Sequence, residues 1–478
     1  WARKARRYAE LPRAQLAGRQ RDIARIGNAV ARGAPRGQGP VWTERDRRAG
    51  LGTALPQDLQ SWGTEAQAIS KRESRRVARA RSEAWQEWAA KAWSDSPGRL
   101  YDWCKAERPS PIAATTDQEG AWIMDPGDVV GEATRQWAEL WQLPEGDPGQ
   151  GHGTAPGLPP MDPLDPADLW AIVRRLRSAK AGGLDMWKVA ELKLLPRAAY
   201  RDLAAVLTTI ERAGSWPRGL RGSLVTLLPK KGDHSPMAQR PISLLPMIYR
   251  IWAAARAPLL RGWLGENAHE SAWGLGKGRG ADSAAWVSAA GAEVAAARGD
   301  SIFTADIDCE KCYDRVPLAA LRAEGESTPL AGLVGLAVAQ YAAHRHLRWA
   351  GATGARVEHI TGGITAGCPL ANGILHLYMR PAMIRVSAKG GPGSLRTYVD
   401  DWRIVAEGTR REAATRLIGA LGEACDALAE RGMKVNATKT FIMASGAADR
   451  AYIKSQAGDR FGHMVTGAVK DLGVDSAL

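Results

Sequence analysis

The sequence contains few residues of several kinds, and each shortage excludes a class of protein. Its 5 cysteines are odd in number and scattered over 478 residues, so we expect a reducing compartment and no disulfide framework. No apolar run reaches the roughly 18 residues that a membrane-spanning helix needs. The 8 histidines show no metal-ligand spacing, and no signal-peptide pattern follows Trp1. These features predict an intracellular protein that is neither secreted nor held in a membrane.

Acidic residues are outnumbered by basic ones, 51 against 65, and the net charge is +14. Residues 1–50 contain thirteen Lys and Arg against four Asp and Glu. A basic segment of this kind favours a polyanionic partner such as nucleic acid, and a solvated arm without a fixed partner is the alternative. Phenylalanine is scarce too, at 3 against 19 tryptophans. This bias is typical of GC-rich codons and does not by itself indicate base stacking.

The chain is long enough for two or three domains. Residues 64–105 have a helical pattern with Trp85, Trp88 and Trp93 on one apolar stripe, for which core packing is expected. Residues 143–168 are rich in Pro and Gly and indicate a linker or long loop. The predicted domains are a basic, mainly helical N-terminal region (1–110), a linker (111–168) and a folded region (169–478).

Beyond the linker, helical and strand patterns alternate. The predicted helices include residues 167–179, 369–386 and 410–432, and the predicted strands include residues 301–308, the hairpin 395–408 and residues 222–233, which end in a turn. Strands from distant segments must then form one sheet that helices cover. This pattern predicts an α+β arrangement.

Two acidic groups lie among apolar strand residues. Asp400 and Asp401 stand within "TYVDDWRIVA", and Asp306 and Asp308 share one face of the strand that leads into "CEKCYDRV". If the two strands are neighbours, three or more carboxylates converge, and bound cations must balance their repulsion. Carboxylate oxygens suit Mg²⁺, or alternatively Mn²⁺, and two such ions support phosphoryl transfer. A solvated acidic turn is the alternative interpretation.

These segments resemble the motifs of reverse transcriptases of the non-LTR retrotransposon type. "TYVDDW" resembles their Y-x-D-D hairpin, and "DCEKCYDRV" resembles their D-x-E-K-A-[FY]-D-R-V segment. Four further matches follow the family's order: "KAGGLDMW", "LVTLLPKKGDHSPMAQRPISLLPMIYRI", "GGITAGCPLANGIL" and "GMKVNATKT". Each motif alone is weakly or moderately specific, whereas the ordered set is strongly specific.

The resemblance implies the fingers and palm of a right-hand polymerase, with an antiparallel palm sheet. It implies an RNA-directed DNA polymerase that uses an RNA template, a DNA or RNA primer, dNTPs and two Mg²⁺ ions, and that works in the nucleus. We expect the family's thumb to be absent from residues 1–478. A catalytically silent or domesticated nucleic-acid-binding remnant and an RNA-dependent RNA polymerase are the alternatives. The sequence identifies no protein partner.

The resemblance also assigns roles to single residues. Asp308 and Asp400 match the metal-binding carboxylates, Asp401 matches a supporting one, and the carbonyl of Cys309 matches a further metal ligand. Tyr313 matches the steric gate that excludes a ribose 2′-hydroxyl. This exclusion needs only a rigid ring in van der Waals contact, so Tyr313→Phe is expected to preserve it. Ordinary packing is the alternative role for Tyr313.

Four basic residues match groups that act on the triphosphate. Lys230 or Lys231, together with Arg240, would grip the incoming triphosphate, for which the forked donor set of Arg is well suited. Lys439 matches the lysine that would protonate the pyrophosphate leaving group. A plain surface position for the first three, and a structural role for Lys439, are the alternatives.

The sequence departs from the family's pattern near the nucleotide pocket. Ala366 stands where the family usually has Gln, which leaves Gly367 to permit a close backbone approach. Asn372 is the second residue of an Ala-Asn pair that replaces the usual Ser-Pro, and Val399 replaces the more common Ala. These changes put efficiency or fidelity in doubt but leave the predicted metal ligands intact.

Overall fold

The chain divides into two units, Trp1–Arg108 and Pro109–Leu478, and each is described by itself. The computed structural model describes residues 56–95, 114–144, 161–228, 235–275, 279–349, 351–444, 446–467 and 469–476, except 118–119 and 472–473. The basic segment 1–50 and most of the Pro- and Gly-rich segment lie outside these residues. So do Lys230 and Lys231. The predicted domain limits stay predictions.

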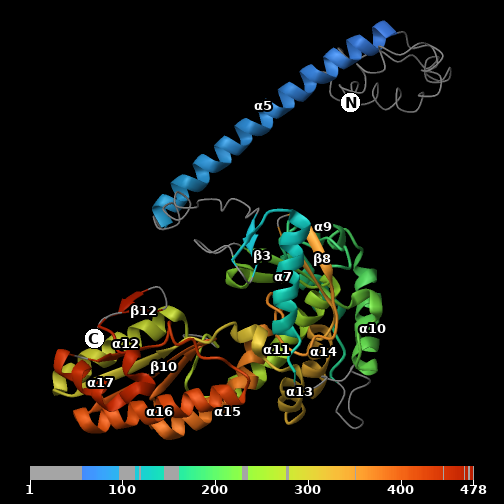
Figure 1. Cartoon of the computed structure of the whole chain (residues 1–478). Coiled ribbons are helices and arrows are strands. Elements are labelled where there is room, and N and C mark those ends of the chain that lie inside the picture. Colours follow the sequence, from blue (N-terminus) through green and yellow to red (C-terminus); the bar gives the residue numbers. More distant parts are fainter. Residues whose placement is uncertain are drawn as a thin grey trace. The chain divides into compact units, whose positions relative to one another are not determined.

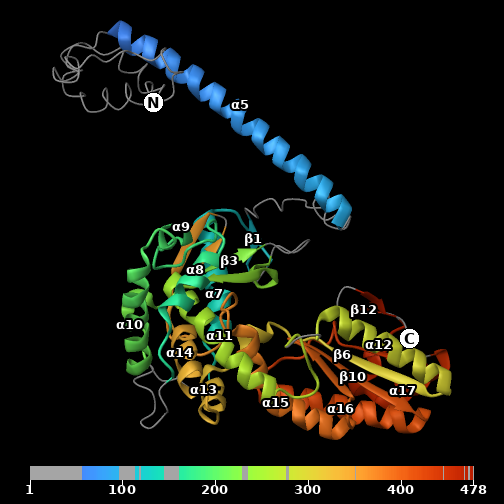
Figure 2. The ribbon, with the colours of Figure 1, turned by 180° about the vertical axis from the view of Figure 1, so that it is seen from behind.

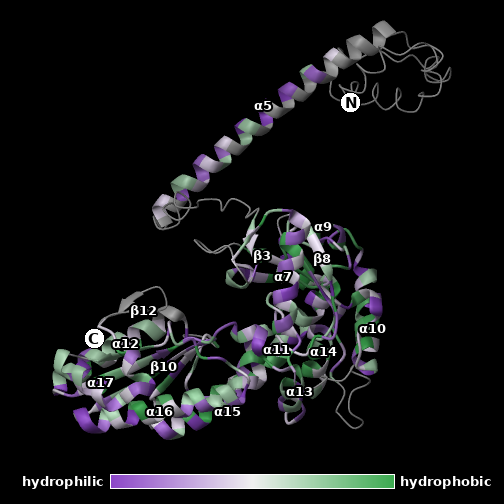
Figure 3. Cartoon of the chain, viewed as in Figure 1, coloured by the Kyte–Doolittle hydropathy of each residue, from purple (hydrophilic) through white to green (hydrophobic). Residues whose placement is uncertain are grey.

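The described residues of the first unit form one helix, α5 (Pro56–Asp95; Figure 1). Its sequence is rich in the helix formers Ala, Arg, Glu and Gln, and Pro56 occupies its first turn. Hydrophilic residues cover much of its length (Figure 3). Trp85, Trp88 and Trp93 are 45%, 40% and 66% exposed, so the core packing predicted for them is wrong.

A five-stranded sheet in the second unit has the order β11-β6-β10-β9-β5 (Figures 1 and 2). Its strands are β5 (Ala272–Trp273), β6 (Ser301–Ile307), β9 (Leu395–Tyr398), β10 (Asp401–Gly408) and β11 (Phe441–Ala444). β6 pairs antiparallel with β10 and β11, and β9 pairs antiparallel with β10. β5 runs parallel to β9, so the sheet is mixed.

Helices cover both sides of this sheet. Figures 1 and 2 show α15 (Ala371–Gly390) and α16 (Arg410–Glu430) along one side and α12 (Ala281–Arg298) on the other. Residues of β10 alternate in burial, with Trp402 and Ile404 buried and Arg403 only partly buried. This period of two is the one expected for a sheet between two different environments.

A second sheet of four strands has the order β4-β3-β7-β8. Its strands are β3 (Ser223–Leu228), β4 (Arg240–Leu244), β7 (Arg345–Trp349) and β8 (Ala352–Val357). β3 pairs antiparallel with β4 and parallel with β7, and a register shift interrupts the pairing of β7 with β8 between His346 and Arg348. The two sheets and their helices confirm the predicted α+β class.

Helix α7 (Pro126–Trp141) packs against the four-stranded sheet. Asp125 caps it by accepting from the backbone N–H groups of Gly127 and Asp128, and a proline follows at its first position. One side of the helix is buried, with Trp137 and Trp141 almost inaccessible. The predicted linker 111–168 is therefore wrong over this stretch, because its apolar residues recur at helical spacing and are buried.

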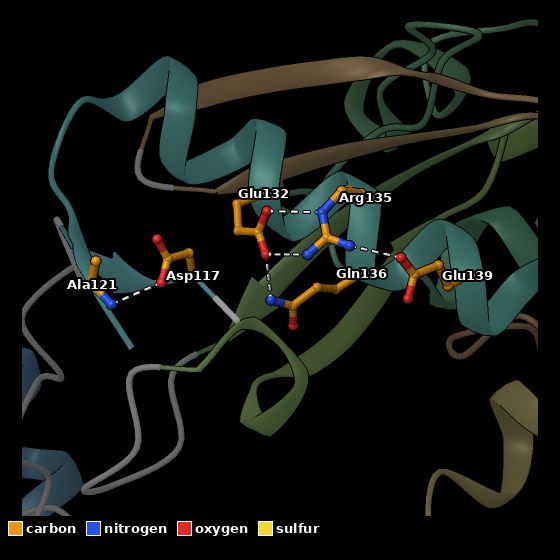
Figure 4. A network of polar contacts seen from close by, with 6 residues as sticks. All are labelled: Asp117, Ala121, Glu132, Arg135, Gln136 and Glu139. Atoms are coloured by element: carbon orange, nitrogen blue, oxygen red, sulfur yellow. Dashed lines mark hydrogen bonds and ion pairs between the residues drawn. The ribbon is translucent and has the colours of Figure 1, made fainter. Parts of the chain in front are cut away.

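The opposite side of α7 is polar. Arg135 donates to Glu132 at 2.6 and 3.0 Å and to Glu139 at 2.7 Å, and Gln136 donates to Glu132 at 2.6 Å (Figure 4). Asp117, in the turn between β1 (Thr115–Thr116) and β2 (Trp122–Ile123), accepts from the backbone N–H of Ala121 at 2.7 Å. The helix is thus amphipathic, as a surface element over a core should be.

The remaining elements complete the second unit. They are α8 (Pro166–Arg175), α9 (Val189–Leu192), α10 (Arg197–Ala213), η1 (Arg218–Leu220), η2 (Pro236–Ala238), α11 (Met247–Asn267), η3 (Cys312–Arg315), α13 (Leu318–Glu326), α14 (Ala331–Tyr341), α17 (Ala447–Phe461), η4 (Gly462–Met464), β12 (Val469–Asp471) and β13 (Val474–Ser476). Among the described residues, no helix has the length and apolar character that a membrane crossing requires.

Candidate active site

The turn between β9 and β10 carries one acidic pair. Asp401 pairs with Tyr398, so Val399 and Asp400 form a two-residue turn. Val399 has a φ of 60°, which β-branched residues rarely adopt. Such strain persists only where the surrounding structure imposes it, and it is concentrated at functional sites. The turn holds Asp400 partly buried at the end of the sheet, while Asp401 is exposed.

Asp308 follows β6 directly and lies beside this turn. The register of β6 and β10 sets Ile307 opposite Trp402, so Asp308 and Asp400 leave the sheet at the same end. Burial raises the pKa of the Asp400 carboxyl, and the nearby Asp308 carboxylate also raises it. The two carboxylates predicted as metal ligands are therefore neighbours.

Asp306, which was expected to join these two carboxylates, has a different partner. Arg403 lies opposite Asp306 in the register and donates to both of its carboxylate oxygens, at 2.5 and 2.7 Å. Among the described residues, no three His, Cys, Asp or Glu side chains are grouped so that they could hold a metal ion. Asp306, Asp308 and Asp401 line one cavity, but Asp306 does not complete a group of three metal ligands, because β pairing gives its carboxylate an arginine.

A loop that follows α16 also contacts Asp308. The backbone N–H of Asn436 donates to the carbonyl of Asp308 at 2.8 Å, and the Asn436 side chain accepts from the N–H and hydroxyl of Thr438. This turn presents Lys439, whose Nζ lies 4.0 Å from Asp308 Oδ2. The spacing of the "NATKT" segment thus brings a cation to the carboxylate.

Cys309 is buried where this loop crosses the end of β6. It forms an antiparallel bridge with Val435, and the bonds of the bridge come from the flanking N–H of Glu310 and the carbonyl of Asp308. The carbonyl of Cys309 takes no part in the bridge. Its role as a metal ligand stays a prediction.

Tyr313 lies in η3, next to the acidic pair. Its hydroxyl donates to Asn372 Oδ1 at 2.8 Å, and its carbonyl accepts from the N–H of Ile364 at 2.8 Å. Burial raises the pKa of the Tyr313 hydroxyl, and so does the nearby Asp400 carboxylate. The predicted gate residue is therefore a neighbour of the predicted metal ligand.

The loop that precedes α15 touches β4. The N–H of Ser243 donates to the carbonyl of Ala366 at 3.1 Å. Gly367 has a φ of 97°, and a Cβ added there would lie 2.9 Å from the carbonyl oxygen of Ser243. Gly367 thus permits a close approach of this loop to β4, whereas its role at the nucleotide stays a prediction.

The predicted triphosphate grip is only partly described. Arg240 is exposed at the beginning of β4, whereas Lys230 and Lys231 lie outside the described residues. A third lysine, Lys311, was not predicted. Its Nζ donates to the carbonyl of Gln239 at 3.0 Å and lies 4.5 Å from the ring centroid of Trp137. Lys311 thereby links the loop after β6 to the start of β4 and to α7.

A buried group beneath η3 was also missed by sequence reasoning. Trp141 Nε1 donates to Asp314 Oδ1 at 3.0 Å, and the Arg345 guanidinium lies 4.6 Å from the Trp141 ring centroid. Arg345 also donates to the carbonyls of Gly362 and Gly363, at 3.2 and 2.9 Å. Burial raises the pKa of the Asp314 carboxyl, while the Trp141 N–H and the Arg345 charge lower it. In the sequence, Asp314 within "CYDRV" was the one signal that could have indicated this buried group.

A cavity of about 240 Å³ lies beside Asp308 and the strands β9 and β10. Its lining includes Trp273, Asp308, Arg396, Asp401, Lys439 and Phe441. Residues from the five strands of this sheet, from helix α12 and from the segments that follow β6 and precede β11 thus meet around one space. The neighbouring carboxylates with a nearby lysine form a site suited to chemistry on phosphate groups, in which a cation is needed to balance the charge.

The α+β fold carries a site suited to chemistry on phosphate groups, and the similarities to known proteins assign the chain to the nucleotidyltransferase enzymes. Residues 228–474 match the family model of the reverse transcriptases (RNA-dependent DNA polymerases). The chain belongs to this family, and the predicted resemblance to non-LTR reverse transcriptases is confirmed.

Two individual proteins are similar over smaller parts. The chain is 32% identical over 95 residues to the probable RNA-directed DNA polymerase from transposon X-element of Drosophila melanogaster, and the match covers 20% of this chain and 10% of that protein. An apo telomerase from Candida tropicalis, truncated from its C-terminal domain, has a TM-score of 0.37 and 12% identity over 59% of each chain. The second similarity is too low to define the fold.

Proposed function

We propose that the chain synthesises DNA on an RNA template by two-metal nucleotidyl transfer from a dNTP to a primer 3′-hydroxyl. The observation that carries this proposal is the pair of neighbouring carboxylates of Asp308 and Asp400, beside Lys439, in a member of the reverse transcriptase family. The name of the similar Drosophila protein supports a non-LTR retroelement as the source. The corresponding partners are an RNA template and a DNA or RNA primer, in the nucleus.

In this proposal the two sheets have different roles. The five-stranded sheet with α15 and α16 is the palm, because it carries Asp308 and Asp400. The four-stranded sheet is part of the fingers, because β4 begins at the exposed Arg240 and the segment between β3 and β4 contains Lys230 and Lys231. Basic side chains at this position would bind the triphosphate.

The residues at the site fit Mg²⁺ or Mn²⁺. Asp308 and Asp400 supply hard oxygen ligands, and their proximity makes a bound cation favourable. Substrate phosphates usually complete such sites, which agrees with the small number of protein ligands here. Asp308, Asp400 and the carbonyl of Cys309 would hold the metal, and Asp401 would support the turn. The bound ions would activate the primer hydroxyl and stabilise the leaving oxygen.

Two further side chains act on the nucleotide. Lys439 Nζ, 4.0 Å from Asp308 Oδ2, would donate a proton to the leaving pyrophosphate. The Tyr313 ring, beside Asp400, would occupy the space of a ribose 2′-hydroxyl. With these roles Tyr313 would select a deoxynucleotide, and Lys439 would protonate the pyrophosphate that leaves.

Primer extension on an RNA template tests the proposal, with dNTPs and NTPs supplied in separate reactions. We expect Mg²⁺-dependent extension by the parent with dNTPs, and none by Asp308→Asn or Asp400→Asn. Asp426→Asn is the control, because Asp426 is an exposed acidic residue on α16 that is paired with Arg460 and does not line the cavity. Extension only with NTPs would favour an RNA polymerase. Nucleic-acid binding without extension would favour a silent remnant.

A further inference from the structure

The predicted gate residue has a side-chain partner that the resemblance did not suggest. The Tyr313 hydroxyl donates to Asn372 Oδ1 at 2.8 Å. Asn372 stands in the first turn of α15, and the resemblance led us to expect proline there, which has no acceptor in its side chain. The contact therefore depends on the departure from the family's pattern.

The hydrogen bond acts on the end of the Tyr313 side chain that the backbone does not fix. The Tyr313 carbonyl is held by the N–H of Ile364, and the ring packs against the buried core. The Tyr313 ring can therefore move only by rotation about the side-chain bonds of this residue. Since Asn372 belongs to α15 and Tyr313 to η3, the hydrogen bond ties the outer edge of the ring to a separate, rigid element.

We propose that Asn372 is a positioning residue for sugar selection, which holds the Tyr313 ring against the ribose so that deoxyribonucleotides are preferred over ribonucleotides. This inference rests on the proposed function. Steric exclusion works only while the ring cannot retreat, because a 2′-hydroxyl adds a single oxygen to the sugar. A ring without its tether can turn aside by a fraction of an ångström and admit the ribonucleotide. The hydroxyl of Tyr313, and not its ring alone, is then part of the gate, so Tyr313→Phe should weaken the exclusion, in contrast to the expectation from the resemblance.

A double-mutant cycle tests the pair through the ratio of kcat/KM for a dNTP to kcat/KM for the matching NTP. We expect Asn372→Ala and Tyr313→Phe each to lower this ratio about fivefold, the factor that corresponds to one neutral hydrogen bond. The double variant should lower it by no more than either single change, because both remove the same contact. The decrease should come from faster use of NTPs.

Tyr378→Phe is the matched control. The Tyr378 hydroxyl, on the same helix, donates to the carbonyl of Arg431 at 2.8 Å, so the change removes a comparable bond that involves neither Tyr313 nor Asn372. The ratio should stay at the parent's value in this variant. A purely structural role for Asn372 would lower the kcat/KM values for dNTP and NTP alike.

The outcomes separate the two proposals. A parent that extends with dNTPs, combined with single variants of unchanged ratio, overturns the inference and leaves the proposed function standing. Additive effects in the double variant also overturn it, since they would show that the two residues act apart. A parent that extends with neither nucleotide type overturns both proposals.

Discussion

Gly367 lies where the loop before α15 passes closest to β4. Its φ of 97° disfavours any side chain, and the atom that a Cβ would meet at 2.9 Å is a backbone oxygen. Gly367→Ala must therefore move the loop, and we expect it to lower the free energy of unfolding by about 1 to 3 kcal/mol. The KM for dNTP should rise as well. Urea denaturation and steady-state kinetics measure the two effects.

Gly335→Ala provides the comparison. Gly335 lies within α14, and no atom lies within 4 Å of the position that its Cβ would occupy. Alanine favours the helix there, so this variant should gain up to about 1 kcal/mol. If Gly367→Ala is as stable as the parent, the close approach to β4 does not constrain this loop.

At the residue scale, motif spacing predicted the neighbours Asp308 and Asp400 but not the partner of Asp306. The spacing of a strand shows which side chains share a face, whereas the residue opposite depends on the register with another strand. Arg403 meets Asp306 only because β10 pairs with β6 in one register. The bond between Tyr313 and Asn372 was missed for a similar reason, since it joins two elements far apart in sequence.

At the element scale, α7 carries an indole that holds Asp314 in place. Trp141→Phe keeps most of the ring but removes the N–H that donates to Asp314 at 3.0 Å. A partly buried carboxylate then loses a donor, and we expect a loss of about 1 to 3 kcal/mol in the free energy of unfolding. The turn of η3 should shift, so kcat for primer extension should fall too. Thermal or urea unfolding and single-turnover kinetics provide the measurements.

Trp286→Phe is the control for this change. Trp286 lies on α12 and is 72% exposed, so the loss of its N–H should leave both stability and kcat near the parent's values. Equal stability of the Trp141→Phe protein and the parent would show that Asp314 does not depend on this helix.

Several elements around the candidate site were predictable from local pattern, whereas α7 was missed although its apolar residues recur at helical spacing. The predicted helices 369–386 and 410–432 correspond to α15 and α16. The predicted strands before Asp308 and around Asp400 correspond to β6 and the β9–β10 hairpin. α7 lies between turn-rich segments, and its burial depends on contacts 173 positions along the chain. Local pattern carries no information about such a contact.

At the scale of the whole molecule, one buried histidine makes stability depend on pH. Burial, followed by the charges of His269 and Arg380, lowers the pKa of His376 to about 4. The unfolded chain, with a histidine pKa near 6.5, binds a proton between these values that the folded chain does not. Stability should therefore fall as the pH drops from 7 to 5, by about 2 kcal/mol from this group.

Urea denaturation of the parent and of His376→Leu at pH 7 and 5 checks this. The variant should lose about 2 kcal/mol less than the parent over that range, since it has no such proton to bind. His463→Leu changes an exposed histidine and should follow the parent. Identical pH dependence in all three proteins would remove His376 as the cause.

Nucleic-acid binding by the whole chain can be tested on α5. The helix exposes five basic side chains over about three turns: Lys71, Arg72, Arg75, Arg76 and Arg79. Changing the four arginines to Gln should weaken RNA binding. The slope of log affinity against log salt should become shallower by about 0.7 for each phosphate group that the helix no longer neutralises, or up to about 3 in total.

The same four positions changed to Lys form the control, because charge is kept while the forked donor set is removed. The slope should then stay near the parent's value. An unchanged slope in the Gln variant would show that α5 does not bind the phosphate backbone.

The contacts of α7 also determine when this protein can complete its core during synthesis. The carbonyl of Trp141 accepts from Thr361, 220 positions later in the chain. At translation rates of about 5 to 20 residues per second, α7 leaves the ribosome roughly 10 to 45 seconds before that partner exists. During this interval two large indoles have no core to enter. A chaperone that binds exposed aromatic segments would meet nascent chains at this helix well before Asp308 and Asp400 are translated.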